Sequence, residues 1–415
     1  MRWIKPSRID GRVSAPPSKS AMIRAIAAAS LADGISELRN PAFCDDALAA
    51  IGVAVALGAK VVCGEKTVKI KGQGRPVRTV LDCGESGLCL RLFAPVAALG
   101  KKEMTLSGQG SLGKRPVGMM EGPLSDLGVA CRSNAGFPPL RVKGPLRGGP
   151  AALDGSVSSQ FLTGLLTSLP ACEGDSELTV SKLRSRPYVD LTISVLSKFG
   201  VSVSWDKTRD AFKVKGGQRF EPQKYEVEGD WSAAAFLLVA AALAGRITVK
   251  KLANDSCQAD RRILDVLREA GAAVSTGDSE VTVAAGDLRA FDFDATDSPD
   301  LFPPLAALAC FCDGQSSIRG VYRLRHKESN RAEALVEELS RIGGRLEIRG
   351  NVMRIRGGRL EGGAVDSRGD HRMAMAGSVA GLRAGNGVRV EGYQAISKSY
   401  PRFFEDLASV GGDIA

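Results

Sequence analysis

The chain has 415 residues, of which 44% are apolar and 25% are charged, and its net charge at pH 7 is +10. This is the composition of an ordinary soluble protein with two or three domains, and no apolar run approaches the roughly 18–20 residues that cross a membrane. Nine dispersed cysteines and two histidines argue against a metal site, and the start, MRWIKPSRIDG, lacks signal-peptide character, so a reduced cytoplasmic enzyme is expected.

The excess of positive charge points to an anionic partner. Lysine and arginine are dispersed without a basic tail, and aromatic residues make up only 5% of the chain, which argues against nucleic acid. Small, multiply charged anions are the favoured partners. A basic surface without a specific partner is the alternative.

In chain order, the residues after Gly58 predict two strands, AKVVCG and TVKIKG, around a tight turn. A helix is predicted to begin near Ser86, KEMTLSG is predicted to be a strand, and a further helix is predicted over 116–127 with Pro116 at its first position. This β-α-β-α-β-β order recurs along the chain and indicates an α/β protein with sheets wrapped around helices.

The same unit is predicted six times. Six helix-like stretches end in an apolar residue and a glycine, and the positions of neighbouring glycines differ by 70, 72, 71, 72 and 68. A glycine after an amphipathic helix is expected to adopt the left-handed conformation that ends the helix. The glycines are Gly58, Gly128, Gly200, Gly271, Gly343 and Gly411.

Two proline-containing segments are predicted to connect two domains of three units each. One is the polar stretch GGQRFEPQKYEVEGD just after the third repeat glycine, and the other is Pro16-Pro17 near the start. If the units of a domain surround a pseudo-threefold axis, corresponding helix ends point the same way. Two such domains facing each other would enclose a cleft that attracts anions.

Polar segments at helix N-termini, which we call helix entrances, are the segments most suited to chemistry, because the N-terminus of a helix attracts anions. Lys19, Ser20 and Arg24 would form such a site, although taken alone they are better explained by a serine cap with solvated charges. Asp300 is predicted to be either a helix cap or a general base, and Lys327, Glu328 and Arg331 either a salt-bridge cluster or functional groups. The eight entrances are 17–20, 84–87, 113–116, 155–160 (with a similar one at 185–188), 298–300, 325–331, 370–376 and 397–401.

Six ordered motifs, PPSKSAMIR, GSVSSQF, SRPYVD, HKESNR, GDHRMAM and SKSYP, resemble the family of 5-enolpyruvylshikimate-3-phosphate synthases (3-phosphoshikimate 1-carboxyvinyltransferases) over about residues 5–410. The resemblance implies two domains, 19–227 and 1–18 with 228–415, forming an inside-out α/β barrel with the active site between them. It also implies transfer of the enolpyruvyl group of phosphoenolpyruvate to the 5-hydroxyl of shikimate 3-phosphate in chorismate and aromatic amino acid biosynthesis. No cofactor and no metal would be needed, and a cytoplasmic monomer without nucleic acid or membrane partners is expected.

The resemblance also implies a role for individual residues. Asp300 would be the general base, Glu328 the proton donor with Lys398 as the alternative, and Lys19 a further catalytic group. Phosphoenolpyruvate would bind Lys19, Gly87, Arg115, Gln160, Arg331, Arg372 and Lys398. Shikimate 3-phosphate would bind Lys19, Ser20, Arg24, Ser158, Ser159, Gln160, Ser185, Tyr188, Asp300 and Lys327.

The chain departs from the family pattern at Pro17, where glycine is common, at Glu85, where many members have asparagine, and at Arg323, where some members bind the substrate through asparagine. These changes put substrate affinity in question more than the reaction. Three alternatives remain. The first is the sister family of UDP-N-acetylglucosamine enolpyruvyl transferases, most of which carry a cysteine in the loop corresponding to 108–116, where this chain has none. The others are the RNA 3′-phosphate cyclases, which would need His371 as a nucleophile, and a binding protein without catalysis.

Overall fold

A computed structural model describes residues 1–156 and 158–415, so Val157, within the predicted entrance 155–160, lies outside the described residues. The chain divides into two compact units, each with its own apolar core. We call Pro17–Val227 the continuous unit, and Met1–Pro16 with Glu228–Ala415 the split unit. The family resemblance implied that Pro17 and Ser18 belong to the other domain, whereas here they fall in the continuous unit, where Ser18 caps the first helix.

The continuous unit contains three four-stranded sheets in its described residues, with strand orders β14-β3-β5-β4, β6-β7-β9-β8 and β10-β11-β13-β12. Its elements are α1 (Lys19–Leu31), β3 (Ile35–Arg39), α2 (Asp45–Ala56), β4 (Lys60–Cys63), β5 (Thr67–Lys71), β6 (Val80–Asp82), α3 (Gly87–Ala97), β7 (Glu103–Ser107), α4 (Glu121–Asp126), β8 (Ala130–Asn134), β9 (Phe137–Lys143), β10 (Pro150–Asp154), α5 (Gln160–Ser168), β11 (Ser176–Ser181), α6 (Arg186–Lys198), β12 (Ser204–Asp206), β13 (Ala211–Val214) and β14 (Lys224–Glu226).

The split unit likewise contains three four-stranded sheets, ordered β16-β17-β15-β2, β18-β19-β21-β20 and β22-β23-β1-β24, among the residues described. Its elements are β1 (Arg2–Lys5), β2 (Ile9–Ser14), α7 (Trp231–Ala244), β15 (Gly245–Lys250), α8 (Ile263–Glu269), β16 (Ala273–Thr276), β17 (Glu280–Ala284), β18 (Asp292–Asp294), α9 (Phe302–Ala309), β19 (Gln315–Arg319), α10 (Arg331–Arg341), β20 (Arg345–Arg349), β21 (Val352–Arg356), β22 (Gly363–Asp366), α11 (His371–Gly381), β23 (Val388–Glu391), α12 (Phe403–Ser409) and β24 (Asp413–Ile414).

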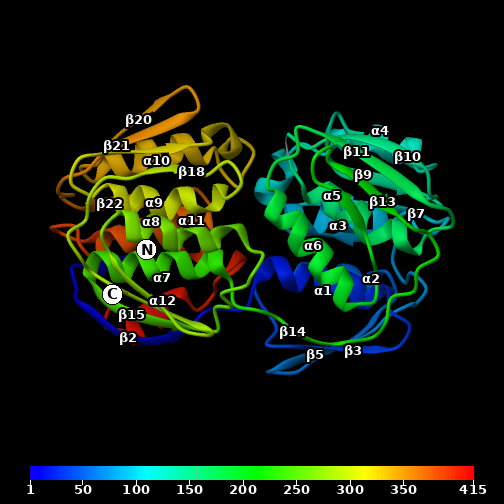
Figure 1. Cartoon of the computed structure of the whole chain (residues 1–415), viewed down its shortest axis with the longest axis horizontal. Coiled ribbons are helices and arrows are strands. Elements are labelled where there is room, and N and C mark those ends of the chain that lie inside the picture. The colour runs from blue at the N-terminus through cyan, green and yellow to red at the C-terminus, as the bar shows by residue number, and fades with distance from the viewer. Residues whose placement is uncertain (157) are drawn as a thin grey trace. The chain divides into compact units, whose positions relative to one another are not determined.

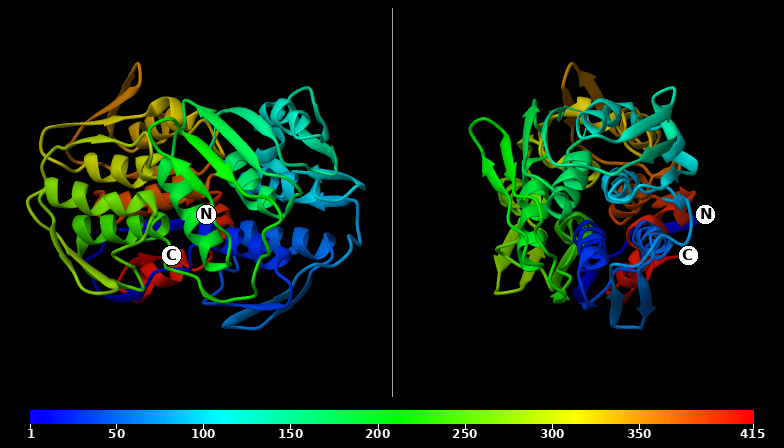
Figure 2. Two further views of the ribbon diagram at one scale, coloured as in Figure 1. Left: turned by 45° about the vertical axis from the view of Figure 1, so that its right-hand side comes forward. Right: turned by 90° about the vertical axis from the view of Figure 1, so that its right-hand side faces the viewer.

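The predicted β-α-β-α-β-β unit and the α/β fold class are confirmed. Among the described residues, two strands that flank a helix pair in parallel in four of the sheets, and in three of these a hairpin then adds two antiparallel strands, as in β6, β7, β8 and β9. In the other two sheets the parallel strand comes from a distant part of the chain, with β14 beside β3 and β2 beside β15. The N-terminal strands β1 and β2 complete two sheets of the split unit. Trp3 and Ala415 exchange backbone hydrogen bonds, and both views of Figure 2 place the two chain ends near each other.

The helices fall into an inner and an outer class. The inner helices α7, α9 and α11 of the split unit, which are labelled in Figure 1, contact one another and are buried along most of their length. The sequences of α7 and α9 are almost entirely apolar, as burial on every face requires. Outer helices such as α10 are amphipathic. The six repeat glycines follow α2, α4, α6, α8, α10 and α12, and all six have positive φ angles between 78° and 105°, so the predicted caps are confirmed.

The predicted helix over 116–127 is wrong in its first half. Two 3-10 turns, Gly110–Lys114 and Gly118–Met120, precede α4, which begins only at Glu121. Pro116 lies in the segment between the turns, where its carbonyl accepts a hydrogen bond from Arg91 over 2.9 Å. Glycine at 118 also weakens any helix that would include it.

Within the described part of the chain, the helices are all too short or too polar to cross a membrane.

Candidate active site

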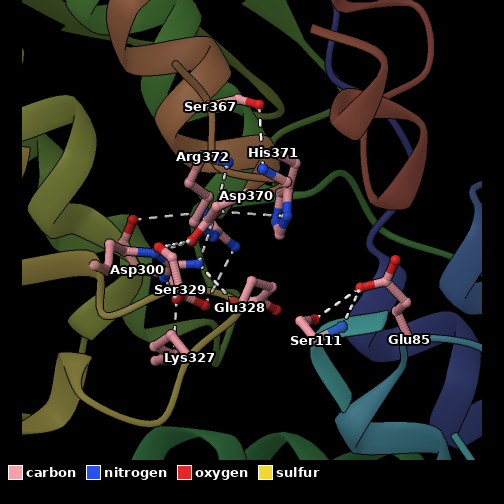
Figure 3. A network of polar contacts seen from close by, with 12 residues as sticks. Glu85, Ser111, Asp300, Lys327, Glu328, Ser329, Ser367, Asp370, His371 and Arg372 are labelled. Atoms are coloured by element: carbon pink, nitrogen blue, oxygen red, sulfur yellow. Dashed lines mark hydrogen bonds and ion pairs between the residues drawn. The ribbon is translucent and has the colours of Figure 1, made fainter. Parts of the chain in front are cut away.

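Arg331, the first residue of α10, lies among three carboxylates of the split unit. Its Nε and Nη2 donate to the two oxygens of Asp370 over 2.9 and 3.1 Å. Its Nη1 donates to Asp300 over 2.9 Å, and its Nη2 also donates to Glu328 over 2.7 Å. Burial by itself would lower the pKa of Arg331, but the charges of the three acids raise it. The buried guanidinium therefore holds the three acids in one arrangement, and Figure 3 shows those acids with Lys327 and Arg372.

Asp300 is an ionised carboxylate surrounded by cations. It lies in the 3-10 turn Pro299–Leu301 that leads into α9. Besides Arg331, its carboxylate accepts from Lys327 over 3.1 Å and pairs with Arg372 over 3.2 Å. Burial opposes ionisation, but the charges of Arg372, Lys327 and Arg331 hold the pKa of Asp300 well below its usual range. The turn thus directs this carboxylate to side chains from two other helix entrances.

Asp370 connects the N-terminus of α11 to the N-terminus of α10. Its side chain accepts from the backbone N–H of Arg372 over 2.9 Å, which caps α11, and from Ser329 over 3.2 Å, in addition to Arg331. The carboxylate is fully buried. His371, next in the chain, is only 1% exposed, with its Nδ1 3.8 Å from Asp370. A histidine nucleophile must reach its substrate, so this burial argues against the RNA-cyclase alternative.

The other predicted groups of the split unit lie at neighbouring helix entrances. Burial lowers the pKa of Lys327, although the charge of Asp300 opposes this. Arg323, in the 3-10 turn Val321–Leu324, adds a further positive charge that lowers the pKa of Lys327. Lys398 ends the 3-10 turn Tyr393–Lys398 ahead of α12 and is buried.

The charges of Asp300 and Arg372 also act on a further buried acid, Asp260. It lies in the 3-10 turn Ala259–Arg262 and accepts a hydrogen bond from the hydroxyl of Ser232. Burial, then the charge of Asp300, raises the pKa of Asp260 to about 6, while the charge of Arg372 opposes the shift. Two acids in one region therefore have pKa values displaced in opposite directions.

In the continuous unit, α1 begins with Lys19, and Ser18 caps it by accepting from the backbone N–H of Ala21 over 3.3 Å. The predicted helix start is confirmed. The amine of Lys19 pairs with Asp46 at the start of α2 over 2.8 Å, and both side chains are largely buried. Asp46 therefore sets the direction of the lysine.

Arg24, one turn further along α1, is held by neutral oxygens. Its guanidinium donates to the Thr192 hydroxyl over 2.9 Å, the Ser20 carbonyl over 2.8 Å, and the Thr163 hydroxyl and Tyr188 carbonyl over 3.3 Å each. Burial lowers the pKa of Arg24 to about 10. The arginine joins α1 to α5 and α6 while its charge stays uncompensated by these partners.

Gly87 and Arg115 meet at the entrance of α3. A Cβ on Gly87 would lie only 2.7 Å from Nη1 of Arg115, so glycine at this position lets the guanidinium rest against the helix N-terminus. Both residues are buried. A guanidinium beside free backbone N–H groups forms a corner that attracts anions.

Gln160 begins α5, and its side-chain oxygen accepts from Arg91 over 2.7 Å. Its backbone N–H donates to the hydroxyl of Ser158 over 3.1 Å. Ser159 directly precedes α5, and Ser185 precedes α6 in the left-handed conformation, φ 55°, with Tyr188 in the first turn of α6. Arg91 thus connects the α5 entrance to Pro116 and the segment that carries Arg115.

Glu85 is turned toward the neighbouring 3-10 turn. Its carboxylate accepts from the backbone N–H and the hydroxyl of Ser111 over 3.0 and 2.7 Å, as Figure 3 shows. Gly110 passes so close to Glu85 that a Cβ there would lie 2.5 Å from its carboxyl carbon. The acid that departs from the family pattern therefore holds this turn in place.

Several residues of the site were not singled out by the sequence. Arg91 had a signal, because a single arginine within the apolar stretch LCLRLFAPVAAL requires a buried polar partner. Asp370 lies in the predicted entrance 370–376, but its contact with Arg331 was not predicted. Nothing local distinguished Asp46, Thr163 or Asp260.

The comparisons with known proteins agree with one another. The sequence model of the family described as EPSP synthase (3-phosphoshikimate 1-carboxyvinyltransferase) matches residues 4–407. The 3-phosphoshikimate 1-carboxyvinyltransferase of Aeropyrum pernix is 40% identical over 99% of this chain and 96% of its own length. That of Methanopyrus kandleri is 43% identical over 97% and 96%. Among solved structures, an EPSP synthase from Acinetobacter baumannii has a TM-score of 0.84 and 25% identity, covering 100% of this chain and 99% of its own.

Proposed function

Because the chain belongs to the EPSP synthase (3-phosphoshikimate 1-carboxyvinyltransferase) family, we propose that it transfers the enolpyruvyl group of phosphoenolpyruvate to the 5-hydroxyl of shikimate 3-phosphate and releases phosphate. The observation that carries this proposal is the Asp300 carboxylate among Lys327, Arg331 and Arg372. An acid–base group surrounded by cations suits a reaction between two polyanions.

In the proposed reaction, Asp300 takes the proton from the 5-hydroxyl as its oxygen bonds to C2 of phosphoenolpyruvate. Glu328 in its protonated form gives its proton to the methylene carbon, which becomes a methyl group and leaves C2 cationic for the attack. Because the contact with Arg331 favours the ionised form of Glu328, Lys398 is the alternative donor. The tetrahedral intermediate then loses phosphate as a methyl proton returns to the donor. The departing phosphate takes the proton that Asp300 had accepted, so that the base is restored and each bond formed at C2 and C3 is matched by one broken.

Substrate binding is expected to strengthen the base. A carboxylate with a low pKa is a weak proton acceptor, and cations keep the pKa of Asp300 low. Substrate anions that pair with Lys327 or Arg372 would offset part of this positive charge. The pKa of Asp300 would then rise when the hydroxyl is ready to be deprotonated.

The remaining predicted groups would bind the two anions. Arg24 supports a role in holding shikimate 3-phosphate, because its buried charge is met only by hydroxyl and carbonyl groups in the described residues. Gly87 and Arg115 support phosphoenolpyruvate binding through an arginine fork beside a helix N-terminus. The shikimate 3-phosphate site would also include Lys19, Ser20, Ser158, Ser159, Gln160, Ser185, Tyr188, Asp300 and Lys327, and the phosphoenolpyruvate site Lys19, Gln160, Arg331, Arg372 and Lys398.

Phosphate release by the purified protein tests the proposal. Release with phosphoenolpyruvate and shikimate 3-phosphate, and none with UDP-N-acetylglucosamine in its place, is the expected result. Release only with the sugar nucleotide would assign the chain to the sister reaction, and no release with either acceptor would reject both. The expected cytoplasmic monomer stays a prediction, which light scattering of the purified protein and fractionation of cells would test.

A further inference from the structure

The segment 366–372 carries Asp370 and Arg372 between β22 and α11 in a turn that costs strain. Arg368 has a left-handed φ of 52°, which a side chain disfavours, and Gly369 follows with a φ of 70°. The side chain of Asp366 accepts from the backbone N–H of Arg368 over 2.8 Å. Such a turn persists where surrounding contacts determine its shape.

Glu338, two turns beyond Arg331 on α10, supplies several of those contacts, and Ser367, whose hydroxyl donates to the carbonyl of Gly392 over 2.9 Å, supplies others. Its carboxylate accepts from the backbone N–H of Asp366 over 3.0 Å, and from Nε and Nη2 of Arg368 over 3.0 and 2.7 Å. Arg341 donates to both of its oxygens. The Glu338 side chain is 1% exposed, so this carboxylate is buried with its charge matched by two arginines.

One face of α10 therefore holds the segment at both of its ends. Arg331 holds Asp370 at the start of α11, and Glu338 holds Asp366 and Arg368 at the end of β22. Arg372, which pairs with Asp300, follows Asp370 by two residues and Arg368 by four. A change in the shape of this turn would move the Arg372 guanidinium relative to Asp300.

We propose that Glu338 is a positioning residue, which sets the place of Arg372 by fixing the turn 366–370 to α10. The inference deepens the proposed function, because it assigns Glu338 an effect on phosphoenolpyruvate binding without contact to the substrate. Its neighbour Glu337 is the matched control. Glu337 also pairs with Arg368, but its side chain is 54% exposed, and exposed pairs of this kind contribute little.

The test compares Glu338→Gln with Glu337→Gln in the full chain, by amide hydrogen exchange and by steady-state kinetics. In Glu338→Gln, exchange over 366–372 should become faster, and the KM for phosphoenolpyruvate should rise about tenfold or more while that for shikimate 3-phosphate changes less than about twofold. Glu337→Gln should match the parent protein in the exchange rate over 366–372 and in the KM values for both substrates. Arg368→Gln, which leaves Glu338 paired with Arg341, should reproduce the effect and replaces Glu338→Gln if that variant does not fold.

Unchanged exchange over 366–372 would overturn the inference whatever the kinetics show. Faster exchange with both KM values unchanged would also overturn it, because loosening the turn would then have no effect on substrate binding. If the parent protein does not release phosphate, the proposed function fails in that assay. The exchange result and the affinity for phosphoenolpyruvate measured by calorimetry still decide the role of Glu338.

Discussion

Arg24, one turn into α1, and Arg331, at the start of α10, are both buried arginines, yet their surroundings are opposite. Arg24, in the continuous unit, donates to two hydroxyls and two carbonyls, and burial lowers its pKa to about 10. Arg331, in the split unit, donates to Asp300, Glu328 and Asp370, whose charges raise its pKa although burial opposes this.

The difference shows that a buried cation serves two purposes depending on its partners. Neutral partners position Arg24 but leave its charge available, so an anionic ligand would relieve an electrostatic cost. The charge of Arg331, by contrast, is matched by its carboxylate partners, and it holds these acids in a fixed arrangement. We infer that the Arg24 cluster contributes mainly to substrate affinity, and the Arg331 cluster mainly to turnover. Three experiments test this comparison.

The largest effect is expected from Asp300→Ala. Loss of a general base slows reactions by about 10²–10⁴-fold, so turnover should fall by at least this factor. The protein should stay folded and bind shikimate 3-phosphate, because the cations around the position remain. Phosphate release, calorimetric binding of shikimate 3-phosphate and thermal melting measure the three quantities. Asp292→Ala, at an exposed acid of β18, is the control, and near-normal turnover of Asp300→Ala would remove Asp300 from the mechanism.

The next effect concerns Arg24→Lys, which keeps the charge but loses the planar fork. Hydrogen bonds to charged groups contribute about 1.5–3 kcal/mol, so the KM for shikimate 3-phosphate should rise about 10- to 100-fold with little change in kcat. Arg209→Lys, at an arginine whose side chain is 84% exposed, should behave like the parent. A fall in kcat with unchanged KM would break the division of roles between the two clusters.

The smallest effect concerns pH and Asp260. Its pKa is raised to about 6 in the folded protein, against about 3.9 in an unfolded chain, so between these values the folded state binds the extra proton. The free energy of unfolding contributed by this group therefore falls as pH rises from about 4 to about 6, and is level above that. Relative to Asp260→Asn, the parent should lose stability over this range in urea denaturation. Parallel pH curves for the two proteins would show that Asp260 does not titrate there.

Local sequence was informative wherever a few neighbouring residues decide the structure. The six glycine caps and the start of α1 at Lys19 followed from helix periodicity and capping. The expected helix from Pro116 is wrong in its first half, where Arg91, 25 positions earlier, donates to the carbonyl of Pro116 and Gly118 disfavours a helix. Asp370 was visible as an acid before a helix, but its hold on Arg331, 39 positions away, was not.

The sequence by itself determined the repeated α/β unit, the family, and the helix entrances at which polar side chains gather. These depend on period, caps and ordered motifs, which act over a few residues or match a known pattern. Tertiary structure alone decided that Arg24 would meet Thr192, 168 positions away, and that Lys19 would meet Asp46. Any cation can pair with any acid or hydroxyl, and only the packing of helices around a core selects which of them come within hydrogen-bonding distance.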